Sequence, residues 1–146
     1  MELSDSGLSI RRATQNDLDL LISMNLQLMS DEQYDRPLEM PAVRTRMQHF
    51  ISDRNFGAFL FLANDAVAGY AVMELDKTPL YLRHFFIQSE FRRKHIGTSC
   101  FKLLLKQLKT DTIDLDVMVW NTRGFGFWKS LGFSERCISM TYRPSE

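Results

Sequence analysis

The sequence predicts an α/β (α+β) fold in one domain over residues 1–146, on three observations. The chain has 146 residues, 45% of them hydrophobic, which suits one buried core and not two domains. Three short apolar runs stand in the middle of the chain with turn residues between them, as in consecutive antiparallel strands. Segments with apolar residues at helical spacing precede and follow these runs.

A strand and two helices are expected in the first part of the chain. Residues 8–12 are short and β-prone, and Thr14 with Asp17 three positions later is the capping-box pattern of a helix that should run to about Met29. Pro41 suits the first turn of a second helix. The apolar stripe of this second helix is Val43, Met47, Phe50 and Ile51. The residues expected to face outward are Arg44, Arg46 and Gln48.

The middle of the chain reads as a three-stranded antiparallel meander over residues 57–63, 67–75 and 80–87. Asn64 and Asp65 lie between the first two strands and tolerate the positive φ of a tight hairpin turn. The runs contain few polar residues, which is typical of a sheet covered on both faces.

Two more helices and two more strands are expected after the meander. The first helix runs from residue 96 to about 109, and its predicted buried stripe is Ile96, Cys100, Leu103, Leu104 and Leu108. Residues 113–120 alternate as in a strand. A short helix follows and stops at Gly132, and residues 137–142 read as a last strand.

The composition argues against two kinds of partner. Eighteen basic residues balance eighteen acidic ones, so the chain lacks the broad basic face that a nucleic-acid-binding protein needs. Neither a secretory signal nor an apolar run of about 18 residues is present. We therefore expect a cytoplasmic protein without a membrane partner.

Metal binding is not expected either. Cys100 and Cys137 occupy apolar positions in different elements, which favours buried free thiols over a disulfide. The histidines His49, His84 and His95 show no metal-ligand spacing with one another or with the cysteines.

A row of basic residues, within the segment EFRRKHIGTSC at 90–100, lies where the third strand of the meander leads into a helix. The first N–H groups of such a helix have no backbone partner and carry partial positive charge, so they form an anion site. Gly97 lets a ligand approach the backbone, and the Thr98 hydroxyl can donate a hydrogen bond. The spacing matches neither dinucleotide-binding nor P-loop motifs. The alternative is a solvated basic loop.

This segment resembles the phosphate loop of the GNAT superfamily of acyl-CoA-dependent N-acyltransferases. That loop has Arg or Gln, two variable residues, Gly, one variable residue, then Gly or Ala, and Arg92, His95, Ile96 and Gly97 fall on it, with His95 in place of the first glycine. LRHFFI matches the family's fourth strand, and LDVMVWN…GF matches its fifth strand, an Asn, a helix and a closing Gly-Phe. The resemblance covers residues 82–133; the first half agrees only in element order.

The resemblance implies a mixed, mostly antiparallel sheet that is splayed between strands four and five, with helices on both faces, and it implies acetyl-CoA as the cofactor. The amides of residues 93–98 would hold its pyrophosphate. The backbone of the fourth strand would bind its pantetheine arm, and the Phe85 N–H would polarise the thioester carbonyl. The residues implied to bind cofactor are Phe85, Phe86, Ile87, Arg92, Arg93, Lys94, His95, Ile96, Gly97, Thr98, Asn121 and Trp128.

Two of these residues keep a structural alternative. Asn121 would bond the cofactor arm, and it is also suited to be the N-cap of a helix. Trp128 stands where the family often has a tyrosine that protonates the departing thiolate. Because an indole cannot supply that proton, we expect water or no acid in this role, or a plain core aromatic.

Acetyl transfer requires a neutral amine, so a group must accept its proton. The candidates are Asp116, His84 and Glu74, and water is a further route. Asp116 has an alternative role as an ion-pair partner of Arg83, and His84 as a half-buried, hydrogen-bonded ring. No Cys or Ser stands beside a base, so direct attack without a covalent enzyme intermediate is expected.

Acceptor binding is expected at the loop between the first two helices and on the fourth strand. The residues are Asp31, Glu32, Tyr34, Asp35, Tyr81 and Arg83. An acidic loop attracts a cationic amine, whereas Arg83 points to an acceptor with a carboxylate; a merely solvated loop is the alternative. The acceptor is expected to be a small-molecule or peptide amine. A homodimer, a weak or inactive acyl-CoA-binding regulatory module and a domain that docks a phosphorylated partner stay open.

Overall fold

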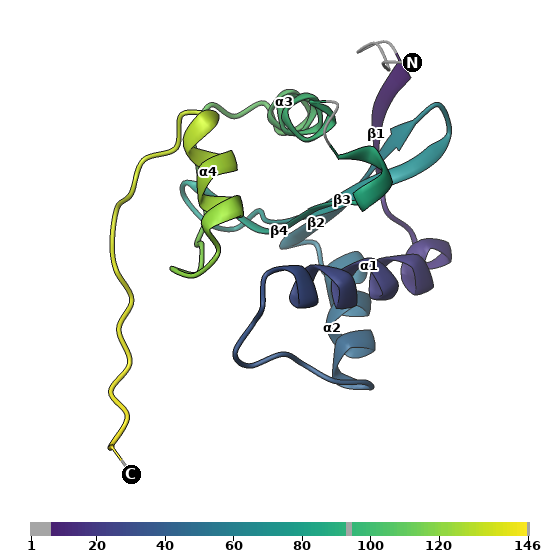
Figure 1. Cartoon of the computed structure of the whole chain (residues 1–146). Coiled ribbons are helices and arrows are strands. Elements are labelled where there is room, and N and C mark those ends of the chain that lie inside the picture. The colour runs from purple at the N-terminus through teal and green to yellow at the C-terminus, as the bar shows by residue number, and fades with distance from the viewer. Residues whose placement is uncertain (1–6, 93–94, 146) are drawn as a thin grey trace.

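The computed structural model describes residues 7–92 and 95–145 and contains one mixed five-stranded sheet (Figure 1). The strand order is β1-β2-β3-β4-β5, with the first four strands antiparallel and β5 parallel to β4. The strands are β1 (Leu8–Arg12), β2 (Phe56–Ala63), β3 (Ala66–Glu74), β4 (Leu80–Ile87) and β5 (Ile113–Asp114). The expected α/β (α+β) class, with its mostly antiparallel sheet, is confirmed.

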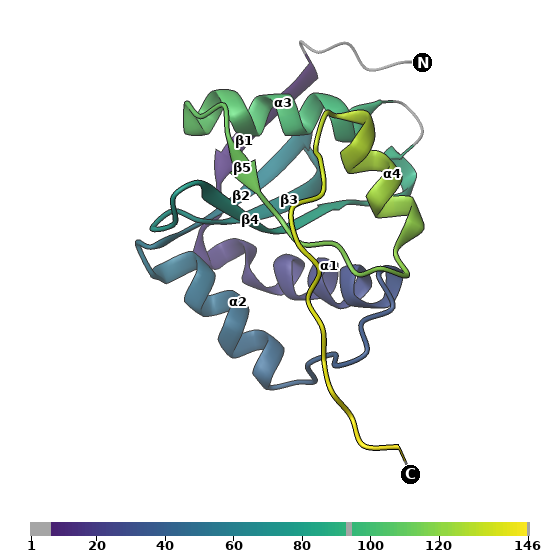
Figure 2. The ribbon, with the colours of Figure 1, turned by 90° about the vertical axis from the view of Figure 1, so that its left-hand side faces the viewer.

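Helices cover both faces of the sheet, as expected. On one face lie α1 (Leu18–Asp31) and α2 (Ala42–Ser52), and on the other lie α3 (Ile96–Leu108) and α4 (Thr122–Ser130) (Figures 1 and 2). Within the described residues, no helix is long and apolar enough to cross a membrane.

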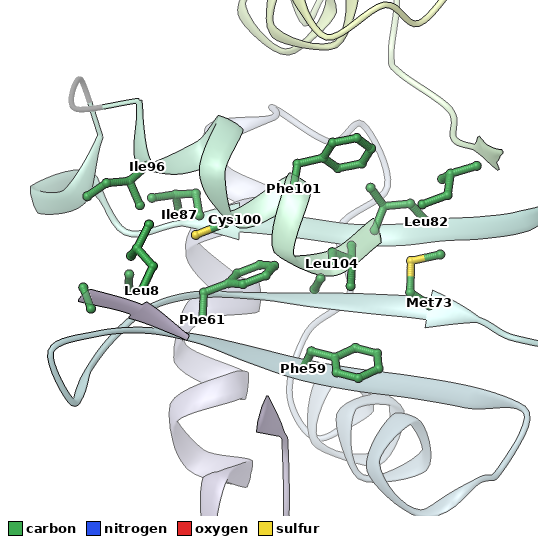
Figure 3. Packing of buried hydrophobic residues seen from close by; sticks show 14 residues of the cluster. Leu8, Phe59, Phe61, Met73, Leu82, Ile87, Ile96, Cys100, Phe101 and Leu104 are labelled. Carbon is green, nitrogen blue, oxygen red and sulfur yellow. The ribbon is translucent and has the colours of Figure 1, made fainter. Parts of the chain in front are cut away.

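The two faces bury separate hydrophobic clusters, which explains why the strands are apolar at successive positions. Along β2, Phe59 and Phe61 pack toward α3, against Cys100 and Leu104 (Figure 3), while Leu60 packs toward α1 and α2. Strand residues alternate between faces, so a sheet covered on both sides needs apolar side chains at both odd and even positions.

Both N-terminal helices begin where the sequence predicts. Asp17 accepts a hydrogen bond from the Thr14 N–H at 2.8 Å, and α1 follows after a single 3₁₀ turn, ending two residues later than predicted. Pro41 directly precedes α2. One expectation for α2 is wrong, because Arg46 does not face outward. Its Nη2 donates to the Asn25 side-chain oxygen at 2.7 Å, across the interface with α1.

A β-bulge interrupts β4 in the middle of its pairing with β3. Val72 pairs with His84, and Met73 pairs with Leu82, so Arg83 is the extra residue. The hairpin between β2 and β3 has the expected geometry, with Asn64 at φ 49° and Asp65 at φ 74°.

The C-terminal part of the chain corrects two expectations. β5 has two residues instead of the predicted eight, and residues 137–142 do not form a strand. Instead they run away from the sheet as an extended tail (Figures 1 and 2). Alternation alone does not make a strand, because its backbone groups need a neighbouring strand to bond. In the tail, Cys137 is exposed rather than buried, while Cys100 is buried as expected, and both are free thiols.

Candidate active site

The edge of β4 beyond its short pairing with β5 has no neighbouring strand in the described part of the chain. β5 pairs only with Leu80 and Tyr81. On the other side, the Gln88 N–H donates to the Ala68 carbonyl at 2.7 Å. Because bonded and non-bonded pairs alternate along an antiparallel ladder, His84 and Phe86 turn their backbone groups to β3, and Phe85 and Ile87 turn theirs to the open edge.

This alternation separates the three predicted cofactor-binding residues of β4. The backbone groups of Phe85 and the Ile87 N–H face the open edge, as the predicted contacts with a cofactor arm require. The backbone of Phe86 is engaged within the sheet, and its side chain is buried on the α1 side. Phe86 therefore offers no free main-chain group to a cofactor.

The first turn of α3 begins close to the end of this edge. His95 is its N-cap in the left-handed conformation, at φ 57° and ψ 17°, which explains why glycine suits this place in the family loop. The first intrahelical bond joins the Ser99 N–H to the His95 carbonyl. The N–H groups of Ile96, Gly97 and Thr98 have no acceptor among the residues that the structure describes. The predicted phosphate ligands Arg93 and Lys94 lie outside those residues.

Gly97 lies close to α4, with little room for a side chain. A Cβ at this position would lie 3.3 Å from two ring atoms of Phe127 and 3.8 Å from Ile87 Cγ1. The glycine therefore allows α4 to approach the first turn of α3 closely.

Arg92, predicted to contact phosphate, is engaged on the protein. Its Nε donates to the Ile87 carbonyl at 2.7 Å, its Nη2 lies 2.7 Å from Asp31 Oδ2, and its guanidinium lies over the Phe86 ring. Partial burial opposes ionisation of Asp31, but the hydrogen bonds from Arg92 and Gln27 outweigh it and lower the pKa of Asp31. The predicted phosphate segment and the predicted acceptor loop are thus joined directly.

Asn121 uses both ends of its side chain within the protein. Its oxygen accepts from the Gly124 N–H at 2.9 Å, which is the predicted N-cap contact, and its nitrogen donates to Glu32 Oε2 at 3.2 Å. Next to it, Trp120 Nε1 donates to the Glu32 and Gln33 carbonyls. These contacts hold the start of α4 against the loop between α1 and α2.

Glu32 is the acidic residue of this loop whose pKa is shifted most. Burial raises the pKa of its carboxyl to about 7, although the hydrogen bond from Asn121 opposes the shift. Tyr34 is half-buried in the same loop. Asp35 is exposed and lies 3.4 Å from Arg143 of the tail.

Trp128 lies in an aromatic cluster on the α3 side of the sheet. Its ring centroid is 5.3 Å from those of Phe85 and Phe133, 5.7 Å from Phe101 and 4.8 Å from Phe127. This environment agrees with the core-aromatic interpretation of Trp128. Phe127 also stacks on Phe85, so α4 covers the Phe85 side chain while the backbone of Phe85 faces the edge.

His84 is a buried neutral ring. It is 5% exposed, its Nδ1 lies 3.2 Å from the Tyr70 hydroxyl, and Phe50 packs edge-on against it. Burial, with added repulsion from Arg46 and Arg83, lowers the pKa of His84 to about 3.

The two predicted carboxylate bases have different partners. Glu74 lies 3.3 Å from Arg83, with which it lines an open pocket of about 440 Å³ whose other residues are Lys77, Thr78, Pro79, Tyr81 and Asp114. Asp116 is exposed and does not pair with Arg83. Burial, together with the nearby Asp116 carboxylate, raises the pKa of Tyr81.

A buried polar network between the helices α1 and α2 and the sheet was not predicted from the sequence. Asn25 Nδ2 donates to the Tyr70 hydroxyl at 3.0 Å and lies 3.4 Å from His84 Nδ1, while Arg46 donates to the Asn25 oxygen. The signal was the position of Asn25 within the apolar stripe of α1, between Leu21 and Leu28. In the part of the chain described, no three His, Cys, Asp or Glu side chains are placed to hold a metal ion.

Comparison with known proteins adds a family match and structural neighbours. Residues 23–133 match the model of the Acetyltransferase (GNAT) family. The ribosomal protein bS18-alanine N-acetyltransferase of Salmonella typhimurium is 27% identical over 86 residues, covering 57% of this chain and 58% of the relative. The chain thus aligns with little more than half the length of this curated relative.

Two solved structures share the fold over nearly their whole length. A possible acetyltransferase from Clostridium difficile 630 superposes with a TM-score of 0.76 at 19% identity, covering 95% of this chain and 98% of the other. The aminoglycoside N-acetyltransferase AAC(6')-Iy in complex with CoA superposes with a TM-score of 0.73 at 17% identity, covering 94% of both chains. These two likenesses extend the agreement in fold to the N-terminal half, where the sequence resemblance was limited to element order.

Proposed function

The chain belongs to the acetyltransferase (GNAT) family, and from this premise we propose that it is an N-acetyltransferase that moves an acetyl group from acetyl-CoA to a primary amine. The Salmonella typhimurium relative, an alanine N-acetyltransferase, and the CoA complex of AAC(6')-Iy support the reaction and the cofactor. We further propose direct attack of the amine in a ternary complex. Burial raises the pKa of the Cys100 thiol to about 12, which makes that cysteine unsuited to a covalent route.

One observation carries this proposal: helix N–H groups that have no acceptor among the described residues lie next to an open strand edge. The N–H groups of Ile96, Gly97 and Thr98 suit a diphosphate, since a helix N-terminus combines unpaired donors with partial positive charge. The open edge at Phe85 and Ile87 offers backbone donors and acceptors to the amide-bearing arm of the cofactor. The residues present therefore fit coenzyme A.

Acetyl-CoA supplies an activated acyl group as a thioester. We assign to the Phe85 N–H the role of hydrogen-bond donor to the thioester carbonyl, because this N–H points away from β3 into the open edge. A backbone donor there stabilises negative charge on the carbonyl oxygen during attack. Phe127 and Trp128 pack on the Phe85 side chain, which fixes this part of β4.

We assign proton removal from the attacking amine to Glu32. A general base works best with a pKa near the working pH, and the pKa of Glu32 is about 7. Its hydrogen bond with Asn121 holds it at the junction of the α1–α2 loop and α4. His84 is unsuited because it is buried under Phe50 and its pKa is about 3. Asp116 and Glu74 are the further candidates.

The departing thiolate is proposed to take its proton from water. Trp128 stands where a tyrosine acid is common in the family, and an indole N–H does not transfer a proton under these conditions. A free thiol has a pKa of about 8.5, so the thiolate is a tolerable leaving group without an acid.

The test has two parts. Coenzyme A should raise the melting temperature of the protein by mass action, and primary amines should stimulate thiol release from acetyl-CoA. A protein whose melting temperature does not respond to coenzyme A would contradict the proposed function altogether. A melting-temperature rise without thiol release for any amine would instead support the weak or inactive acyl-CoA-binding module.

We also propose that the protein forms a homodimer through its tail, residues 134–145. Ile138, Met140 and Tyr142 alternate along the tail and are 81%, 89% and 88% exposed. Pairing with an edge of a second copy would satisfy the backbone of the tail and cover these side chains. Sedimentation should give a dimer for the full chain and a monomer after truncation at residue 133. A monomeric full chain would contradict the proposal.

A further inference from the structure

The side chain of Arg46 is held partly inside the protein with incomplete bonding. Its Nη2 donates to the Asn25 oxygen at 2.7 Å and lies 3.9 Å from the Met29 sulfur. Its Nε is buried and has no hydrogen-bond partner. A buried donor without an acceptor is rare in native proteins, and it points to a group that binds there and is absent from the protein chain itself.

Arg46 also lacks a counter-charge. Other arginines of this region have one: Arg83 lies 3.3 Å from Glu74, Arg92 lies 2.7 Å from Asp31, and Arg143 lies 3.4 Å from Asp35. Among the residues that the structure describes, no carboxylate lies within ion-pair distance of Arg46. A partly buried cation without an anion is costly, so this position favours an external anion.

A second guanidinium group, that of Arg83, lies against α2, the helix that carries Arg46. Arg83 sits over the Phe50 ring at 5.6 Å, and Arg46 is one helical turn before Phe50 on α2. The β-bulge at Arg83 explains this position, because it lets Arg83 and its neighbour His84 both contact Phe50. Burial lowers the pKa of Arg46, and repulsion from Arg83 adds to this shift.

We propose that Arg46 and Arg83 together bind the carboxylate of the acceptor, so that the substrate is a primary amine that also carries a carboxylate. This inference rests on the proposed acetyl transfer and names its substrate class. Paired guanidinium groups are well suited to a carboxylate, since their planar N–H donors match its two oxygens.

The local charges also disfavour a purely cationic acceptor. Of the acidic groups that the sequence offered for a cationic amine, Asp31 and Asp35 each pair with an arginine, and Glu32 accepts a hydrogen bond from Asn121. An acceptor with several ammonium groups would be repelled by Arg46, which has no carboxylate partner among the described residues, and repulsion of this kind gives specificity against wrong ligands.

The strand sets the expected length of the acceptor. Arg83 precedes Phe85 by two residues, which is at most about 7 Å along the strand because Arg83 is the extra residue of a β-bulge. If the amine attacks beside the Phe85 N–H, the carboxylate should be separated from it by several bonds. Among ω-amino acids, 5-aminopentanoate and 6-aminohexanoate fit this spacing better than glycine.

The experiment compares each ω-amino acid, from glycine to 6-aminohexanoate, with its carboxamide in the thiol-release assay. A peptide with glutamate after its N-terminal residue, beside the same peptide with glutamine, tests whether the carboxylate belongs to a peptide acceptor. The proposal expects a preference of at least about tenfold in kcat/KM for the carboxylate of a pair, as the loss of a charged hydrogen-bonding partner predicts. Carboxamides or polyamines used as well as the carboxylates would overturn this inference and leave acetyl transfer standing.

Variants locate the site. Arg83→Gln changes a side chain that is 41% exposed and should not disturb folding. It should raise KM at least about tenfold for the preferred carboxylate and leave KM for its carboxamide within about twofold. Arg46→Gln should do the same. Arg44→Gln, an exposed arginine on the same helix, is the matched control and should change neither KM.

If the protein acetylates none of the amines, a binding measurement tests whether Arg46 binds the carboxylate. The Nε–H NMR signal of Arg46, identified by its loss in Arg46→Lys, should shift when 5-aminopentanoate is added to the coenzyme A complex. The carboxamide of the same compound should leave it in place. No shift with either compound would overturn the site, whatever the result for coenzyme A binding.

Discussion

Asp31 and Arg92, 61 positions apart in sequence, form a 2.7 Å ion pair that joins the end of α1 to the segment leading into α3. Both side chains are partly buried, at 29% and 22% exposure. Arg92 also donates to the Ile87 carbonyl, where β4 ends. The loop proposed to receive the acceptor and the turn proposed to receive the diphosphate are therefore held as one unit.

Arg92→Gln should lower the free energy of unfolding by about 2 kcal/mol, because it removes a partly buried charged hydrogen bond and a contact with a backbone carbonyl. Urea denaturation measures the change. The control is Arg44→Gln, which breaks an ion pair with Asp19 at 47% and 87% exposure and should cost less than about 0.5 kcal/mol. Equal costs for the two variants would mean that the Asp31–Arg92 pair does not stabilise the fold.

Two substitutions at Thr98 separate the backbone from the side chain in coenzyme A binding. Thr98→Pro removes an N–H that has no intrahelical partner, at a helix position where proline is tolerated. It should weaken coenzyme A binding by about tenfold or more, the effect of one lost charge-assisted hydrogen bond. Thr98→Ala keeps the N–H and should have a smaller effect. Isothermal titration measures both; equal affinities would place the diphosphate elsewhere.

The sequence predicted the elements around this turn because each depends on local chemistry. The apolar stripe of α3 and the β-prone run of β4 fixed the strand-to-helix junction to the residue. The loop match then marked His95, whose left-handed backbone is the reason for the family glycine. Phe85 and Ile87 were named from the family resemblance, and the strand pairing turns their backbone N–H groups to the open edge. These features need no knowledge of distant residues.

What the sequence did not predict depends on contacts between distant elements. Arg46 was expected in solvent because it precedes the buried Met47 on α2. Asn25, 21 positions earlier, draws it inward. A last strand was expected at residues 137–142, and these residues join no sheet, while β5 ends at Asp114. The periodicity of apolar residues indicates which face of a helix or strand is buried, but it does not indicate which other element packs against that face.

The rate should rise with pH through about 7 if Glu32 accepts the proton of the amine. The carboxyl must be ionised to act as a base, and its pKa is about 7, so kcat/KM is low below that pH and reaches a plateau above it. Glu32→Gln should remove this ascending limb and lower kcat/KM at pH 8 by about a hundredfold. Glu39→Gln, an exposed acid in the same loop, is the control. An ascending limb that persists in Glu32→Gln would transfer the role to Asp116 or Glu74.

His84 should make the fold sensitive to mild acid. The folded protein keeps this ring neutral down to about pH 3, whereas the unfolded chain takes up the proton at the ordinary histidine pKa of about 6.5. The unfolded state thus binds more protons between these values, so stability due to His84 is present above about pH 6.5 and is lost as the pH falls below it. The slope for one such group is at most about 1.4 kcal/mol per pH unit.

Glu32 contributes the opposite sign, since its raised pKa favours the folded state in acid. The two contributions are separated by comparing variants instead of reading one curve. Unfolding free energies of the wild type and of His84→Asn, measured by urea denaturation from pH 7 to pH 5, should converge toward acid because only the wild type loses the histidine contribution. Asparagine keeps a polar partner for the Tyr70 hydroxyl, which limits the direct cost of the change. Parallel curves for the two proteins would mean that His84 is charged in the folded state, and that Arg46 and Arg83 do not act on it as the structure indicates.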